Sequence, residues 1–333
     1  MPHAASPPVL RSLPFLFLVA CGPAWPTIPN QPSGPTSATV PAPVTLVVEP
    51  DAGPQAVLEL LSAARESLWM EMYLLTDDRA IAALVARAAA GVDVRVILEP
   101  APYQQADANQ AAFDRLTAAG ADVRWSLARF TYTHAKTFTV DHARLAVLTL
   151  NLTGAGLAGN REYAAVDDDP TDVGAAEAIF AADAVGADAA PAGRLCTSPE
   201  SSRPTLLALL GGARATLDLE TEELTDGEVL DALLAARGRG VAVTLAWPGP
   251  AAGAPFAKLA AAGATVRAVG APAIHGKVVV ADQRALYLGS ANLTPTSLDD
   301  NREIGLLLAQ PATAAQVAGL VAADAAGGAA PSP

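Results

Sequence analysis

The chain carries one pattern of residues twice, and this duplication constrains its fold more than any other feature. The pattern is a histidine, a lysine two positions later, an aspartate five positions after the lysine and an asparagine ten positions after the aspartate. It occupies His134–Asn151 and recurs in Ile274–Asn292. The tripeptide Asn-Arg-Glu also recurs, and it places a glutamate 28 residues after each histidine. A duplication of this length predicts two copies of one structural unit.

The repeated residues form two matched sets of candidate functional groups. Two of the four histidines and two of the three lysines in the chain lie in the pattern, which argues against a chance match. The candidates for catalysis are His134, Lys136, Asp141 and Glu162 in the first copy and His275, Lys277, Asp282 and Glu303 in the second. The candidates for binding a substrate phosphate are Asn151, Thr149, Asn292 and Ser290.

Strand-like and helix-like segments alternate through both halves. In the first half, Ser67–Leu75 is strand-like, Asp78–Ala90 has helical spacing and Val92–Leu98 is an apolar strand. The repeated pattern follows as two strands, near Ala135–Val140 and Leu145–Leu150, and the second half copies this order. Such alternation predicts an α/β fold with a largely parallel sheet.

The repeated residues resemble the phospholipase D superfamily, whose members carry two His-x-Lys-x4-Asp motifs. The resemblance extends from about Val44 to Gln316 and includes both downstream glutamates. It implies two phospholipase D-like repeats, each a mixed, mostly parallel sheet flanked by helices. It further implies that a pseudo-two-fold axis relates the repeats, that the active site lies at their interface and that the enzyme acts on phosphodiester bonds.

These residue types suit attack on a phosphodiester, because the transition state builds negative charge on the phosphate oxygens. The two lysines can supply positive charge, and one imidazole can attack phosphorus while the other protonates the leaving alkoxide. By resemblance we assign the nucleophile to His134 and the general acid and base to His275. Glu162 and Glu303 are expected to accept a hydrogen bond from a histidine nitrogen, as the aspartate of a catalytic triad does. We expect no metal and no cofactor.

Several residues near the motifs allow more than one interpretation. Asp141 and Asp282 are among the catalytic candidates, although their position near a strand end favours a structural role in closing a turn. Glu71 and Glu220 occupy matching places in apolar strands, and a buried carboxylate needs a partner, so functional and structural roles both stay open. In the first motif Leu148 replaces a glycine, so we expect different phosphate contacts on that side.

The N-terminal segment has the features of an export signal. Arg11 precedes the apolar run Leu13–Ala20, which is too short to span a bilayer and ends at Cys21. Leu18–Cys21 resembles the lipobox of bacterial lipoproteins, which implies that Cys21 is acylated; an ordinary cleaved signal peptide is the alternative. We therefore predict an exported lipoprotein at the periplasmic face, outer membrane or cell surface, bound to the membrane through Cys21.

The expected organisation has five parts. A Pro-, Ser- and Thr-rich segment after the leader buries too little to fold, and predicts an extended tether. We expect the folded part to be a monomer. The predicted parts are a signal peptide (1–20), the tether (21–43), the first repeat (44–190), the second repeat (191–326) and a disordered tail (327–333).

The charge of the chain narrows the substrate. A formal net charge of −13 weighs against a general nucleic-acid binder, although a nuclease with a locally positive cleft is not excluded. The leading prediction is a phosphodiesterase of phospholipase D type that acts on a phospholipid through a covalent phosphohistidine. The alternatives are a phosphatidyltransferase like cardiolipin synthase, a metal-independent endonuclease and a non-enzymatic binding module.

Overall fold

The computed structural model describes residues 43–249 and 253–331. The predicted signal peptide, Cys21 and nearly all of the predicted tether lie outside these ranges and stay predictions. Among the described residues, no helix combines the length and apolar character that crossing a bilayer requires.

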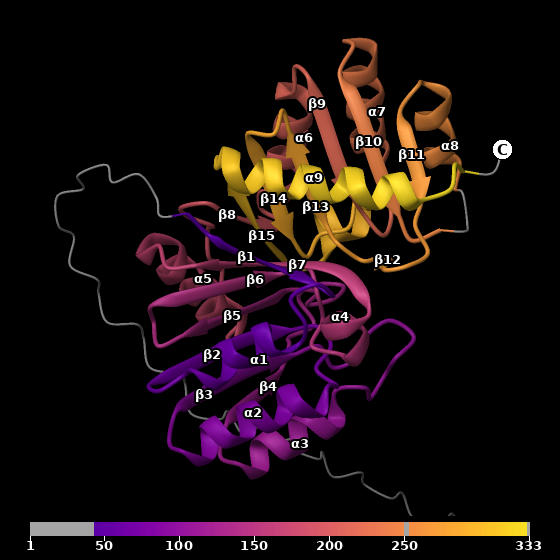
Figure 1. Ribbon diagram of the computed structural model, residues 1–333. Helices are drawn as coiled ribbons and strands as arrows, with labels where there is room; N and C mark the ends of the chain where they lie inside the picture. Colours follow the sequence, from indigo (N-terminus) through magenta and orange to yellow (C-terminus); the bar gives the residue numbers. More distant parts are fainter. Residues whose placement is uncertain (1–42, 250–252, 332–333) are drawn as a thin grey trace, which may run out of the picture. The chain divides into compact units, whose positions relative to one another are not determined.

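The first repeat is a mixed sheet with helices packed against it (Figure 1). Its strands follow the order β1-β7-β6-β5-β2-β3-β4, and β12 of the second repeat adds to β7. The elements are β1 (Thr45–Glu49), α1 (Gln55–Ser62), β2 (Ser67–Met72), α2 (Asp78–Ala89), β3 (Asp93–Leu98), α3 (Gln110–Ala118), β4 (Asp122–Trp125), β5 (Lys136–Val140), β6 (Arg144–Leu148), α4 (Gly154–Ala158), β7 (Asn160–Asp167) and α5 (Pro170–Asp183).

The second repeat copies this arrangement in the order β11-β10-β9-β13-β14-β15-β8. Its elements are β8 (Leu195–Ser198), α6 (Ser202–Gly212), β9 (Thr216–Glu220), α7 (Gly227–Gly238), β10 (Ala242–Trp247), α8 (Ala254–Ala261), β11 (Thr265–Ala268), β12 (Ala273–Ile274), β13 (Val278–Ala281), β14 (Ala285–Gly289), the π-helix η1 (Thr296–Asp300), β15 (Glu303–Leu308) and α9 (Pro311–Gly327).

The two-repeat α/β fold is confirmed, but the expectation of mostly parallel sheets is wrong. Along the two strand orders, parallel pairing is confined to β2, β3 and β4 and to their counterparts β9, β10 and β11. The short strand β12, which lies off these orders, also pairs in parallel with β7. The four other pairings along each sheet are antiparallel. The motif strands explain the difference, because only three residues separate β5 from β6 and β13 from β14. A connection that short makes a hairpin, whereas parallel strands need a crossover of about a dozen residues or more.

The motif strands bury both of their faces, one in each of two cores. In β6, Ala146 and Leu148 pack with the helices of their own repeat, whereas Leu145 and Val147 pack in a cluster that includes Leu288 of β14. Successive side chains of a strand point to opposite faces, so this alternation brings one face of each motif hairpin against the other repeat. The shared core therefore joins the repeats along the strands that carry the motifs.

The C-terminal end is more ordered than predicted. Helix α9 continues to Gly327, and Ala329 forms an antiparallel bridge with Ala268, with N–H···O distances of 2.7 and 2.8 Å. A side chain at Gly328 would place its Cβ 2.8 Å from the carbonyl oxygen of Ala268, so glycine lets the two segments approach. The prediction of a disordered tail that begins at residue 327 is therefore wrong for residues 327–329.

Candidate active site

Each motif histidine is held by the Asn-Arg-Glu strand of the other repeat. The backbone N–H of His134 donates to the carbonyl of Arg302 at 2.9 Å, and that of His275 donates to the carbonyl of Arg161 at 3.2 Å. Strand β12, which ends just before His275, accordingly pairs with β7 of the first repeat. Main-chain hydrogen bonds thus bring both motifs to one site between the repeats.

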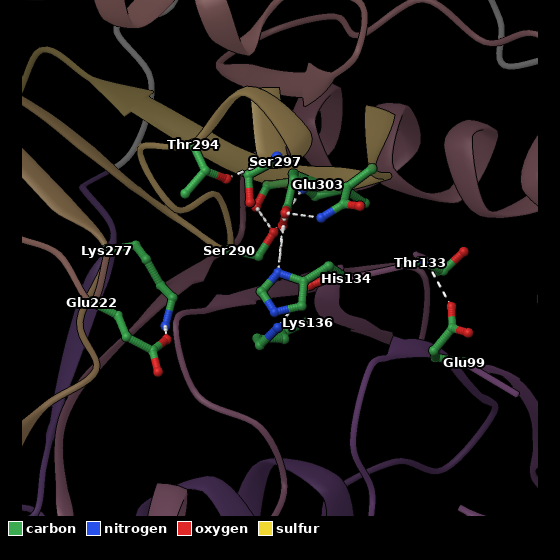
Figure 2. A network of polar contacts seen from close by, with 12 residues as sticks. Glu99, Thr133, His134, Lys136, Glu222, Lys277, Ser290, Thr294, Ser297 and Glu303 are labelled. Carbon is green, nitrogen blue, oxygen red and sulfur yellow. Dashed lines mark hydrogen bonds and ion pairs between the residues drawn. The ribbon is translucent and has the colours of Figure 1, made fainter. Parts of the chain in front are cut away.

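The catalytic candidates also pair across the repeats. Nδ1 of His134 hydrogen-bonds to Glu303, at 2.9 and 3.0 Å from the two carboxylate oxygens (Figure 2). Nδ1 of His275 lies 2.6 Å from Oε1 of Glu162. Both glutamates are fully buried. Burial raises the pKa of a carboxyl group, but the facing imidazole and lysine more than offset this and lower the pKa of both Glu162 and Glu303.

The motif hydroxyls hold these glutamates or the backbone, which corrects the prediction that they bind phosphate. Both side chains are completely buried. The hydroxyl of Thr149 donates to Glu162 at 2.6 Å. Oγ of Ser290 accepts the backbone N–H of Ile304 at 3.0 Å and lies 3.3 Å from its carbonyl oxygen. A hydroxyl used in this way has no proton left for a substrate oxygen.

The two lysines lie buried beside the histidines. Nζ of Lys136 donates to the carbonyl of His134 at 2.8 Å, and Nζ of Lys277 donates to the carbonyl of His275 at 2.6 Å. Burial lowers the pKa of Lys136 to about 7, with Lys277 adding to the effect and Glu303 opposing it. Burial also lowers the pKa of His134, which favours the neutral imidazole.

The motif asparagines lie next to the site, just past β6 and β14. Asn151 and Asn292 are each 9% exposed, and the Oδ1 atom of each is buried and has no hydrogen-bond partner within the described ranges. Their proposed contact with a substrate phosphate stays a prediction.

The motif aspartates lie at the far ends of the motif strands and are not catalytic groups, so their place in the predicted catalytic set is wrong. The carboxylate of Asp141 accepts the backbone N–H groups of residues 65, 66 and 67, at 2.7–3.1 Å from Oδ1. Asp282 accepts those of residues 214, 215 and 216 in the same way. Both aspartates have φ +53°, in the left-handed region of the tight turn. They therefore close the hairpin onto the strand beside it, as their sequence position favoured.

The matching glutamates of the apolar strands lie behind the site. Glu71 and Glu220 are buried, and burial raises the pKa of each well above its usual value. A neighbouring carboxylate, Asp183 beside Glu71 and Asp324 beside Glu220, raises it further. Arg302, which is also fully buried, pairs with Asp183 at 2.7 Å. Each glutamate lies on the strand beside a motif strand, β2 beside β5 and β9 beside β13, and its role stays a prediction.

Sequence reasoning missed one charged residue of the site. Oε2 of Glu222 lies 3.3 Å from Nζ of Lys277 (Figure 2). The same oxygen lies 3.4 Å from Nε2 of His275. Aligning the repeats on their common Leu-Thr-Asp triplet, at Leu75 and Leu224, would have found it, because Glu222 then stands opposite Tyr73. A search for residues that are identical in the two repeats does not find a position where they differ, such as tyrosine in one and glutamate in the other.

Comparison with known proteins finds one kind of domain twice in the chain. A family model described as a cardiolipin synthase, phospholipase D-like domain matches residues 57–184 and again residues 206–324. The chain belongs to the phospholipase D-like family. The two matches fall on the two repeats, and members of this family are enzymes that act on phosphodiesters.

Individual relatives of this phospholipase D-like chain cover it to different extents. Phospholipase D Z of Dictyostelium discoideum is 34% identical over 131 residues, 32% of this chain and 31% of that protein. The chain thus spans about a third of the length of the curated relative that it matches. The phosphatidylserine synthase of Haemophilus influenzae has a TM-score of 0.63 at 12% identity and covers 84% of this chain and 86% of its own. The polyphosphate kinase of Porphyromonas gingivalis has a TM-score of 0.68 at 17% identity. That superposition covers 84% of this chain and 46% of the kinase chain. At these identities both structures show the fold alone.

Proposed function

We propose that the protein hydrolyses the phosphodiester of a phospholipid through a covalent phosphohistidine, with His134 as nucleophile and His275 as general acid and base. The observation that carries the proposal is the crossed pairing of each histidine with a buried glutamate of the other repeat. A carboxylate on Nδ1 fixes the tautomer and leaves Nε2 for the reaction. The lysine beside each histidine supplies the positive charge that a phosphate needs.

In the first step, Nε2 of His134 attacks phosphorus and the bond from phosphorus to the headgroup oxygen breaks. His275 gives its proton to that oxygen, so the headgroup leaves as an alcohol and not as an alkoxide. In the second step, His275 takes a proton from water as the water oxygen attacks phosphorus. The bond from phosphorus to His134 then breaks, and both histidines return to their starting states.

The acidic charge of the chain and its sequence similarity to named relatives both support a lipid substrate. The chain has 21 lysines and arginines against 34 aspartates and glutamates, and two of its three lysines are buried in the candidate site, which disfavours the broad basic surface of a nucleic-acid binder. The matching relative carries the name of a phospholipase D, and the matching family model that of cardiolipin synthase. The family model favours a second candidate function, transfer of the phosphatidyl group to an alcohol, which uses the same intermediate.

The test is to offer the purified full chain vesicles of phosphatidylcholine, vesicles of phosphatidylglycerol and single-stranded DNA, each with EDTA present. We expect headgroup release that falls about 10²–10⁴-fold in both His134→Ala and His275→Ala. Transfer is measured by adding glycerol and looking for a phosphatidylglycerol product. Cleavage of DNA without headgroup release would contradict the lipid assignment.

We also propose that the protein is an exported lipoprotein that reaches its substrate while anchored through Cys21. The Leu18–Cys21 sequence and the Pro-rich segment after it support this proposal. Radiolabelled palmitate should enter the wild-type chain expressed in a bacterium and should not enter Cys21→Ser. Label in both proteins, or in neither, would contradict it.

A further inference from the structure

The two halves of the site differ at one position that faces the reactive groups. In the first repeat this position is Tyr73, whose ring centroid lies 4.5 Å from that of His134 and 4.9 Å from Nζ of Lys136. In the second repeat it is Glu222, whose carboxylate contacts His275 and Lys277. The symmetry of the motifs is thus broken by a carboxylate that only one half possesses.

The charge of Glu222 persists across the working pH range. Burial raises the pKa of this carboxyl, but Lys277 and His275 lower it by more, to about 2. Its side chain is nevertheless 37% exposed, so it can swing aside. Tyr73, in contrast, stays neutral, because burial raises the pKa of its hydroxyl to about 12, and this hydroxyl accepts the backbone N–H of Tyr103 at 2.7 Å.

The two imidazoles therefore experience different fields. His275 has a carboxylate on each ring nitrogen, Glu162 at Nδ1 and Glu222 at Nε2, with Lys277 as the neighbouring cation. His134 contacts the carboxylate of Glu303 and experiences the positive charges of both Lys136 and Lys277. Glu222 also acts on His134 electrostatically, but its direct contacts are to His275 and Lys277. A carboxylate near the reactive nitrogen stabilises the imidazolium, and ammonium groups favour the neutral ring.

We propose that Glu222 is a positioning residue that holds the proton on Nε2 of His275 before the reaction, so that His275 begins as the acid and His134 as the nucleophile. This inference rests on the proposed function and deepens it. When the phosphodiester enters, its phosphate oxygens pair with the ammonium group of Lys277 in place of Glu222. Its leaving oxygen then replaces the Glu222 carboxylate beside Nε2 of His275. The proton then lies on the nitrogen from which it must depart.

The test compares Glu222→Gln, which keeps the shape and removes the charge, with Glu223→Gln, which changes an exposed neighbour. Leaving-group release is measured in single turnovers at saturating substrate, first with phosphatidylcholine and then with phosphatidyl-p-nitrophenol. The nitrophenolate leaves with little help from an acid. We expect Glu222→Gln to slow the phosphatidylcholine reaction about tenfold or more and the nitrophenyl reaction less than about threefold. Glu223→Gln should change neither reaction.

The pH profile separates this role from a merely structural one. In single turnovers at limiting substrate, where the free enzyme sets the profile, the alkaline limb of the phosphatidylcholine reaction should move down by about one pH unit in Glu222→Gln. Glu222→Asp, which is shorter but still anionic, should return the limb most of the way to its wild-type position. If Glu222→Gln slowed both substrates equally, or left the alkaline limb of the phosphatidylcholine reaction where it is in the wild type, the proposal would be overturned.

A titration without substrate keeps this result distinct from failure of the proposed function. Lys277 and His275 hold the pKa of the Glu222 carboxyl at about 2, and carboxyl NMR can follow this group in the free protein. Even if the wild-type protein released neither headgroup, a higher pKa of Glu222 in His275→Ala, with no such rise in Glu223→Gln, would support the contact between Glu222 and His275. An unchanged pKa of Glu222 in His275→Ala would overturn it.

Discussion

His134 and Glu303 belong to different repeats, yet Nδ1 of the histidine lies 2.9 Å from a carboxylate oxygen of the glutamate. The equivalent contact in the other direction joins Nδ1 of His275 to Glu162 at 2.6 Å. Each repeat therefore orients the histidine of the other, and neither motif has its buried carboxylate when its partner repeat is missing. This crossing gives a functional reason for the duplication, because half of the chain holds half of each histidine–glutamate pair.

The crossed pairs predict which histidine responds to which glutamate. Glu303 opposes the lowering of the pKa of His134 by burial, so Glu303→Gln should lower the NMR titration midpoint of His134 further. We expect Glu162→Gln to leave that midpoint nearly unchanged, because Glu162 lies on the other histidine. Both variants should also lose about 10–10³-fold in kcat, because the unheld ring can adopt the wrong tautomer. Responses of each histidine to the glutamate of its own repeat would contradict the crossed arrangement.

The turn aspartates predict a loss of stability without a loss of chemistry. Asp141→Ala removes the acceptor of three backbone N–H groups and puts alanine at φ +53°, so the free energy of unfolding should fall by about 2–4 kcal/mol. The folded fraction should keep the wild-type kcat. Urea titration measures the first quantity, and activity normalised to the folded fraction measures the second.

The pH dependence of this effect has a defined sign. Backbone N–H groups offset the cost of burial and lower the pKa of Asp141, so its contribution is complete above the unfolded-state pKa near 3.9 and is lost as the pH falls through the lower folded-state value. The milder variant Asp141→Asn keeps an acceptor and tolerates a positive φ. Its deficit in unfolding free energy should therefore be constant from pH 7 to about pH 5 and shrink below pH 4. A deficit that grows on acidification would contradict this account.

Much of the site could be predicted from the sequence because the chain states it twice. Identical spacing from His134 to Glu162 and from His275 to Glu303 identified the imidazoles, ammonium groups and buried carboxylates without knowledge of the fold. The crossing could not be predicted, because spacing along the chain does not say which strand of the other repeat lies beside a histidine. That information is carried by β12 pairing with β7 and by the core that the two sheets share.

The other differences also have physical reasons. Thr149 and Ser290 were expected to face the phosphate, but they lie in completely buried positions, where a hydroxyl must satisfy a nearby polar group first. Glu222 was missed because it lies where the repeats differ. The share of parallel strands was overestimated because alternation of helices and strands was extended into the motif hairpins, which contain no helix.

Lys136 predicts how substrate capture depends on pH. Its pKa of about 7 means that the free enzyme carries the positive charge below pH 7 and loses it above. Because kcat/KM reports the free enzyme, kcat/KM for an anionic phosphodiester should fall up to about tenfold per pH unit above pH 7. Bound phosphate holds the proton on the lysine, so kcat should not share this limb. In Lys136→Met, kcat/KM should be low throughout and should lose the same limb. If the wild-type limb persists unchanged in Lys136→Met, another group is responsible.

Gly289 of the second motif predicts a strong steric effect on the strand that presents Ser290. A Cβ at this position would lie 2.5 Å from Cα of Gly305 and 2.8 Å from the carbonyl oxygen of Ile304, and neither backbone atom can move cheaply. We expect Gly289→Ala to lower the free energy of unfolding by about 1–3 kcal/mol. Because β14 pairs there with β15, which carries Glu303, kcat should fall as well.

A matched control for this variant lies in helix α5. Gly174 has nothing within 4 Å of the position that a Cβ would take, and its φ lies outside the left-handed region. Gly174→Ala should therefore leave kcat unchanged and raise the free energy of unfolding by about 0.5–1 kcal/mol, because alanine suits a helix interior better than glycine. Thermal unfolding of the two variants side by side measures the contrast. If Gly289→Ala proved as stable as Gly174→Ala, the close approach of β14 and β15 would be wrong, and with it the placement of Glu303 on His134.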